Sequence, residues 1–72
     1  MADADGTTRK IGKKLKELRL SKSMTQADIA AKAKLNVNYY AKIERADVKP
    51  SIEAYERIAR ALKVTASDIF PF

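Results

Sequence analysis

Residues 24–45 read MTQADIAAKAKLNVNYYAKIER, and this stretch decides the fold. Thr25 and Asn36 are residue types that cap the N-termini of helices, and Asp28 follows Thr25 at the three-residue spacing of a capping box. After each cap, apolar and small residues recur with helical spacing. The stretch therefore predicts two short helices joined by a tight turn, an arrangement that can lay its second helix in the major groove of DNA.

An amphipathic helix is predicted before this stretch, over residues 9–22, because apolar residues recur there at positions i, i+4 and i+7 among charged ones. These apolar residues are Ile11, Leu15 and Leu18. Residues 1–8 are small, polar and acidic, with too little apolar surface to offset the entropy cost of ordering. We expect residues 1–8 to form a disordered tail, and residues 9–72 to form one domain.

Two more helices are predicted after the central stretch. Pro50 interrupts the helical pattern, and Ser51 then caps a fourth helix. Its apolar face is expected to close the core and consists of Ile52, Tyr55, Ile58, Ala59 and Leu62. Thr65 and Asp68 have the spacing of a second capping box and open a short fifth helix that Pro71 ends. The sequence predicts an all-α fold, a compact bundle of five short helices without strands.

The composition excludes several classes of function. The 72 residues include no cysteine and no histidine, so a disulfide, a thiol nucleophile, an imidazole base and the usual zinc sites are excluded. The acidic residues are scattered, and we expect neither an enzyme nor a bound cofactor. Apolar runs stay far below the roughly 20 residues of a transmembrane helix, and the first residues do not resemble a signal peptide, which places the protein in the cytoplasm.

The charge is basic and unevenly distributed. Fifteen Lys and Arg against nine Asp and Glu give a net charge of +6, which attracts polyanions. Seven of the fifteen basic residues lie between Arg9 and Lys22, where Glu17 is the only acid. This basic helix fits contact with phosphates, although a solvated face of an ordinary helix would have the same composition.

The chain resembles the Cro/cI-type (XRE-like) helix-turn-helix family from about residue 11 to residue 69. The resemblance rests on Leu18-Arg19, Met24-Thr25-Gln26, Ala30, Tyr40, Ile43-Glu44-Arg45, and the segments 50–53 and 58–64. It implies a lambda-repressor-like DNA-binding domain with its helix-turn-helix at about residues 25–45. The family usually has glycine in the turn and commonly after the Glu-Arg pair. This chain has Lys34 and Ala46 there, and a non-glycine residue at positive φ in the turn costs about 1 kcal/mol.

The resemblance also implies which residues contact DNA. On a recognition helix at about residues 37–45, Val37 would face a thymine methyl, Asn38 an adenine and Lys42 a guanine. Gln26 would contact a phosphate at the N-terminus of its helix, and Tyr39 would donate its hydroxyl to another.

Further basic and polar residues complete the predicted interface, and some of these assignments have alternatives. Asn36 and Lys49 are included among the DNA-binding residues, and more phosphate contacts could come from Arg9, Lys13 and Lys14. Asn38 could instead be a solvent-facing polar residue, and Val37 a packing contact. Tyr40 lies on the side of Ile43 and fits the core better than DNA.

The resemblance implies two further roles. Arg19 and Glu44 would form a structural ion pair between two helices. A family member of this size usually reads a palindrome as a two-fold dimer, with half-sites about 34 Å apart. The apolar C-terminal residues Ile69, Phe70 and Phe72 are the candidate dimer interface, although Ile69 and Phe70 could simply complete the core.

The predicted function is therefore sequence-specific transcriptional regulation by a homodimer on double-stranded DNA. The segment Asn38-Tyr39-Tyr40 slightly favours the restriction-modification controller type over phage-type repressors and antitoxins. The alternative from another class is a helical protein-interaction module or antitoxin component with residual DNA binding. RNA binding is disfavoured because only Tyr39 could stack on unpaired bases. Asp28 could contact an RNA polymerase subunit or act only as a cap, and the sequence leaves both open.

Overall fold

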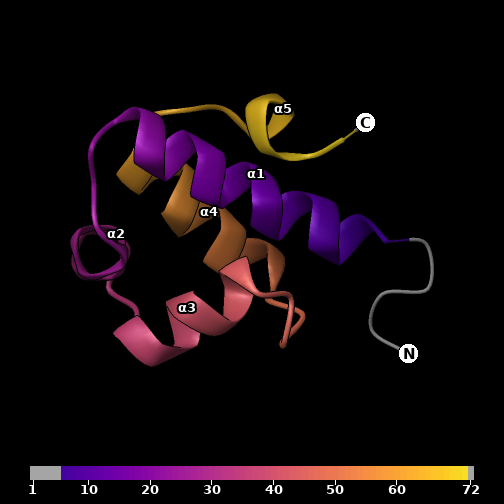
Figure 1. Ribbon diagram of the computed structural model, residues 1–72, viewed down its shortest axis with the longest axis horizontal. Coiled ribbons are helices and arrows are strands. Elements are labelled where there is room, and N and C mark those ends of the chain that lie inside the picture. The colour runs from indigo at the N-terminus through magenta and orange to yellow at the C-terminus, as the bar shows by residue number, and fades with distance from the viewer. Residues whose placement is uncertain (1–5, 72) are drawn as a thin grey trace.

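The computed structural model describes residues 6–71, and all regular structure in this range is helical. The helices are α1 (Thr7–Ser21), α2 (Gln26–Ala33), α3 (Val37–Glu44), α4 (Ile52–Leu62) and α5 (Ala66–Ile69). Figure 1 shows α1 crossing the molecule with α3 on one side of it and α5 on the other. The predicted all-α bundle of five helices is confirmed over these residues. None of these helices combines the length and the apolar composition that crossing a membrane requires.

The core is built from all five helices. Its largest fully buried side chains are Leu15, Ile29, Tyr40, Ile43, Ile58 and Leu62. The helical spacing of apolar residues predicts these positions because a helix in a small domain buries one face. Ile52 is an exception, since its side chain is 68% exposed. The prediction that Ile52 closes the core is wrong, because it occupies the first position of α4, at the edge of the buried face.

The start of α1 also differs from the prediction. Thr7 and Thr8 fall within the predicted disordered tail, but both belong to α1, and Thr8 is 5% exposed. Thr8 lies three residues before Ile11 on the buried face, so its burial helps to offset the cost of ordering this first turn. Gly6 precedes the helix with φ 79° and accepts a hydrogen bond from the Lys10 N–H at 3.0 Å. The rest of the predicted tail, residues 1–5, lies outside the described residues.

The predicted caps set the starts of the other helices. The Thr25 hydroxyl accepts from the Asp28 N–H at 3.0 Å, and the Asp28 carboxylate accepts from the Thr25 N–H at 2.8 Å. The Ser51 hydroxyl accepts from the Ala54 N–H at 3.1 Å at the start of α4. These bonds satisfy N–H groups that lack a partner within the helix. The short sequence pattern alone therefore places both helix starts correctly.

Four helices are followed within two residues by a residue, other than glycine, in the left-handed conformation. These residues are Ser23, Lys34, Ala46 and Lys63, with φ between 56° and 61°. After α2, for example, the Leu35 N–H donates to the Ala30 carbonyl at 2.8 Å, which gives the hydrogen-bond pattern of a glycine-terminated helix. Four helices of the described chain thus terminate in this way without glycine, the residue that adopts positive φ most easily. The prediction of positive φ at Lys34 is confirmed.

Replacing Ala46 by glycine should stabilise the protein by about 1 kcal/mol, because glycine adopts φ 61° without the Cβ strain of alanine. The melting temperature should then rise by about 4–8 °C. The matched control is Ala31→Gly, the same chemical change inside α2, where added backbone freedom should instead cost about 1 kcal/mol. Thermal melts of both variants check this prediction, and a fall in stability for Ala46→Gly would contradict it.

Candidate nucleic-acid interface

The N-terminus of α3 is fixed by the residue before it. The Asn36 side-chain oxygen accepts from the N–H groups of Asn38 and Tyr39, at 2.8 and 3.2 Å. Asn36 was predicted both to cap this helix and to bind DNA. The cap is confirmed and occupies the side-chain oxygen, which leaves the NH₂ group of Asn36 as the donor that could reach DNA.

The two sides of α3 have opposite environments. Tyr40 and Ile43 are 0% and 1% exposed, so the assignment of Tyr40 to the core is confirmed. Val37 is 42% exposed, and Asn38 and Lys42 are exposed as well. The structure therefore brings the three predicted base-reading residues together on one open face, which we call the reading face. Its members are Val37, Asn38 and Lys42.

Tyr39 and Gln26 are less open than the sequence suggested. Tyr39 is half-buried and packs against the core. Gln26 is the first residue of α2, and its side-chain nitrogen donates to the Glu44 carboxylate at 3.0 Å. The side chain of Gln26 is thus held by α3, while its backbone N–H lies at the positive end of α2, where a phosphate would bind.

The predicted ion pair between Arg19 and Glu44 is confirmed. Arg19 donates from Nε and Nη2 to the two Glu44 carboxylate oxygens, at 2.7 and 3.1 Å, and the two side chains are 9% and 3% exposed. Arg19 also donates from Nη1 to the Met24 carbonyl at 2.9 Å. With the bond from Gln26, these contacts join the end of α1, the start of α2 and the end of α3. The contacts of Met24 and Gln26 are not predictable from the sequence, because they join segments that are distant along the chain.

The charges in this network are stabilised by their neighbours. Burial by itself raises the pKa of the Glu44 carboxyl, but hydrogen bonds, chiefly from Arg19, outweigh burial and hold this pKa below its ordinary value. The bond to Glu44 raises the pKa of Arg19. The nearby Tyr40 hydroxyl is buried without a hydrogen bond of good geometry among residues 6–71, and burial raises its pKa, so it stays neutral. The network therefore contains one full ion pair at neutral pH.

Acid should weaken the fold through Glu44. Because its pKa is lowered in the folded state, its contribution to stability is complete above the ordinary glutamate pKa of about 4.3 and is lost as the pH falls through the lower folded-state value. Urea unfolding between about pH 7 and pH 3 should show this loss for the wild type and a smaller one for Glu44→Gln. Identical pH profiles would contradict the assignment.

Gly12 lets α1 approach the end of the recognition helix. A Cβ atom at this buried position would lie 2.6 Å from the Glu44 carbonyl oxygen and 2.7 Å from the Ile43 carbonyl oxygen. Since these are backbone atoms, they can move away only if α3 moves. Gly12 is therefore a positioning residue for α3. The sequence does not predict this role, because a glycine inside a helix does not reveal which segment packs against it.

Replacing Gly12 by alanine should lower the free energy of unfolding by about 1–3 kcal/mol, since the methyl group forces α1 and α3 apart. The neighbouring substitution Lys13→Ala, on the exposed side of the same helix, should stay within about 0.5 kcal/mol of the wild type. Urea unfolding curves of the two variants give the comparison. Equal stability of Gly12→Ala and wild type would show that α3 is not held at this distance.

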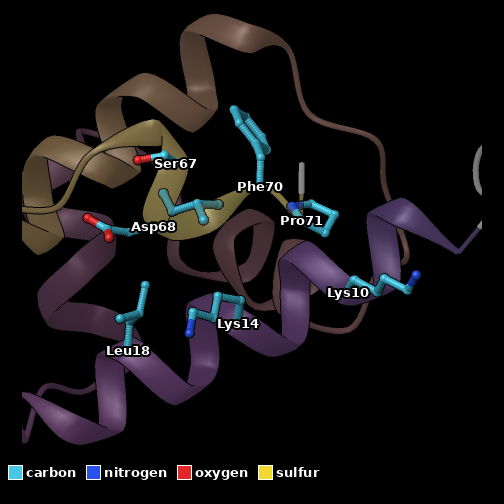
Figure 2. Close-up of a pocket in the computed structure, with 8 residues that line it drawn as sticks. Lys10, Lys14, Leu18, Ser67, Asp68, Phe70 and Pro71 are labelled. Carbon is cyan, nitrogen blue, oxygen red and sulfur yellow. The ribbon is translucent and has the colours of Figure 1, made fainter.

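Some basic residues of α1 lie on a different side of the molecule from the reading face. Lys10 and Lys14 line a cleft of about 610 Å³ between α1 and α5, together with Leu18 and Asp68 (Figure 2). The α5 segment that forms one wall of this cleft lies on the side of α1 away from α3 (Figure 1). Lys14 thus lines the cleft on the α5 side of α1, and its contact with a phosphate stays a prediction. Lys49 is exposed in the loop between α3 and α4.

The predicted dimer interface needs correction. Ile69 is 3% exposed and belongs to the core, so it cannot be an open apolar residue. Phe70 is half-buried, with its ring edge-on to Tyr55 at a centroid distance of 5.4 Å, and Phe72 lies outside the described residues. The open apolar side chain here is instead Ile52, beside a groove of about 280 Å³ between α4 and α5. The sequence pattern missed it because Ile52 matches the helical spacing of the core.

Comparisons with known proteins agree with this geometry. A helix-turn-helix family model matches residues 15–69. The chain is 37% identical over 59 residues to the immunity repressor protein of Bacillus phage phi105, which covers 82% of this chain and 41% of the repressor. The chain thus spans less than half of that relative's length.

Solved structures of two restriction-modification controller proteins are also similar. That of C.AhdI from Aeromonas hydrophila matches with a TM-score of 0.85 and 28% identity, over 88% of this chain and 96% of that one. A C.Esp1396I tetramer in complex with its natural 35 base-pair operator contains a chain that matches with a TM-score of 0.79 and 35% identity, over 83% and 79% of the two chains. The present chain belongs to the Cro/cI-type (XRE-like) helix-turn-helix family.

Proposed function

We propose that this protein is a sequence-specific transcriptional regulator that binds double-stranded DNA as a homodimer on a palindromic operator. The observation that carries the proposal is the reading face. Three side chains able to recognise bases are open on a short helix whose opposite side is anchored in the core. The relatives are a phage repressor and controller proteins, one of them solved on its operator.

In the proposed complex, α3 enters the major groove with its N-terminal residues nearest the bases. Asn38 forms a bidentate contact with adenine, Lys42 donates to guanine, and Val37 packs against a thymine methyl. Gln26 binds the phosphate backbone through its N–H group, and Tyr39, Asn36 and Lys49 add contacts beside the groove. Each base contact discriminates by about 1–3 kcal/mol, which becomes substantial over two half-sites.

The ion-pair network supports this mechanism by holding the parts in register. Glu44 ends the recognition helix, Arg19 belongs to α1, and Gln26 begins the phosphate-binding helix. When the groups that contact bases and those that contact phosphate are fixed relative to each other, less conformational freedom is lost on binding. The protein itself thus sets the tilt of α3.

The second copy is proposed to dock on the groove between α4 and α5, where Ile52 is exposed. A domain of this size covers too few base pairs for a selective site, and two copies related by a two-fold axis read a palindrome. We place the protein in the cytoplasm and assign no catalytic role to its side chains.

The spacing of half-sites tests the proposal. A palindrome selected from random duplexes should bind much more tightly than the same duplex with about five base pairs inserted at its centre, because half a helical turn puts one half-site on the opposite face of the DNA. Insertion of about ten base pairs is the control, because a full helical turn increases the distance between the half-sites but keeps both on the same face of the DNA. Equal affinity for the selected palindrome and for the duplex with the five-base-pair insertion would overturn the proposed dimer.

A further inference from the structure

The groove between α4 and α5 has an apolar floor and an open apolar edge. Ile52 is 68% exposed, whereas Tyr55 and Ala59 behind it are 7% and 9% exposed. Ile69 and Phe70 close the groove from the side of α5. An exposed isoleucine beside such a groove is a surface that gains free energy when another molecule covers it.

Two opposite charges stand at the rim of this groove. Glu56 and Arg60 both line it and lie one helical turn apart on α4. Both side chains are exposed, and neither forms an ion pair within 4 Å in the part of the chain that the structure describes. Glu53 and Arg57, also one turn apart on α4 but outside the groove, face each other at 4.0 Å. The rim charges are therefore available to a partner.

A second copy of this chain complements these charges. In a dimer with a two-fold axis, if residue i contacts residue j of the other copy, then j contacts i as well. Two α4 helices that run in opposite directions across the axis place Glu56 opposite Arg60, and Arg60 opposite Glu56. One acid and one base on α4 of each copy thus form two ion pairs between the copies. Two like charges at these positions would repel instead.

We infer that Glu56 and Arg60 of each copy pair with Arg60 and Glu56 of the other across the α4–α5 groove, and that these two pairs decide which chains dimerise. The inference rests on the proposed function, because it specifies the partner surface of the proposed dimer. The apolar floor supplies most of the binding free energy, and the exposed rim pairs act mainly by rejecting chains with the wrong charges.

Charge reversal tests the inference. In Glu56→Arg homodimers two arginine pairs face each other, and in Arg60→Glu homodimers two glutamate pairs do. Each variant alone should dimerise about tenfold or more weakly than the wild type at low salt. When the two variants are mixed, both cross pairs are again opposite in charge, so a heterodimer of near wild-type affinity should form. Sedimentation equilibrium and native mass spectrometry measure these species.

The double variant adds a specificity test. Glu56→Arg with Arg60→Glu on one chain should form homodimers of near wild-type affinity but few heterodimers with the wild type, because the mixed pairs carry like charges. The matched control is Glu53→Arg with Arg57→Glu, which reverses the same charge types three residues earlier on α4 and should mix freely with the wild type. Circular dichroism verifies that every variant is folded.

The outcomes separate this inference from the proposed function. If the wild type dimerises and binds its selected palindrome, but the mixture of single variants associates no better than either alone, the rim-pair inference is overturned and the regulator remains. If the wild type neither dimerises nor binds a palindrome, the proposed function itself fails. Normal dimerisation of both single variants would also overturn the inference.

Discussion

Replacing Glu44 by alanine should destabilise the protein by about 3–5 kcal/mol, because the Arg19 guanidinium would remain buried without its counter-charge. Arg19 is 8% exposed and donates to both carboxylate oxygens, so water cannot readily replace the lost partner. A domain of 72 residues has only a few kcal/mol of stability, and most molecules of this variant should be unfolded near 25 °C.

Two controls make the Glu44 result interpretable. Glu53→Ala removes an acid that is 76% exposed and 4.0 Å from Arg57, and it should change stability by at most about 0.5 kcal/mol. Glu44→Gln keeps hydrogen-bonding capacity and should cost less than Glu44→Ala. Circular dichroism measures all three, by urea titration for the folded variants and by the signal without urea for the fraction of Glu44→Ala that is already unfolded. Wild-type stability in Glu44→Ala would show that the buried pair does not hold α1 and α3 together.

Asn38→Ala should reduce affinity for the selected operator without affecting folding. The proposed adenine contact is worth about 1–3 kcal/mol per half-site, and both half-sites lose it. The side chain of Asn38 is exposed, and its N–H group, which donates to Asn36, is kept by alanine. Binding should therefore weaken strongly on the selected palindrome and little on a scrambled duplex, with one base position per half-site losing its preference.

Lys49→Ala provides the contrasting variant. If Lys49 contacts a phosphate, its removal should weaken binding to selected and scrambled duplexes by a similar factor and reduce the salt dependence by about one ion. Fluorescence anisotropy with both duplexes measures the two variants under identical conditions. If Asn38→Ala binds the selected palindrome as tightly as the wild type does, the reading face has been assigned to the wrong residues.

The sequence predicts the helices well because their signals are local. A cap such as Thr25 with Asp28, or Asn36 with the N–H groups after it, depends on residues within one turn of each other. The buried face of each helix follows in the same way from apolar spacing. The start of α1 was placed too late because Thr8 is polar by composition, and only the tertiary fold shows that it is buried.

The parts that the sequence could not predict are contacts between distant segments. The approach of Gly12 to the end of α3 and the bond from Gln26 to Glu44 depend on how helices cross. The same limit explains the errors at Ile52 and Ile69. Ile52 fits the helical spacing of a core residue but is open at the first position of α4, whereas Ile69, predicted at the dimer interface, is covered in the core.

The salt dependence of operator binding distinguishes a sequence-specific DNA-binding regulator from a protein-interaction module. Anisotropy of the wild type should be measured on a palindrome selected from random duplexes and on a scrambled duplex, at several salt concentrations. We expect tight binding to the palindrome, much weaker binding to the scrambled duplex, and affinity that falls several-fold for each doubling of salt as phosphate contacts release counterions. Weak and equal binding to both duplexes would rule out sequence-specific regulation and would indicate that the fold serves a protein partner instead.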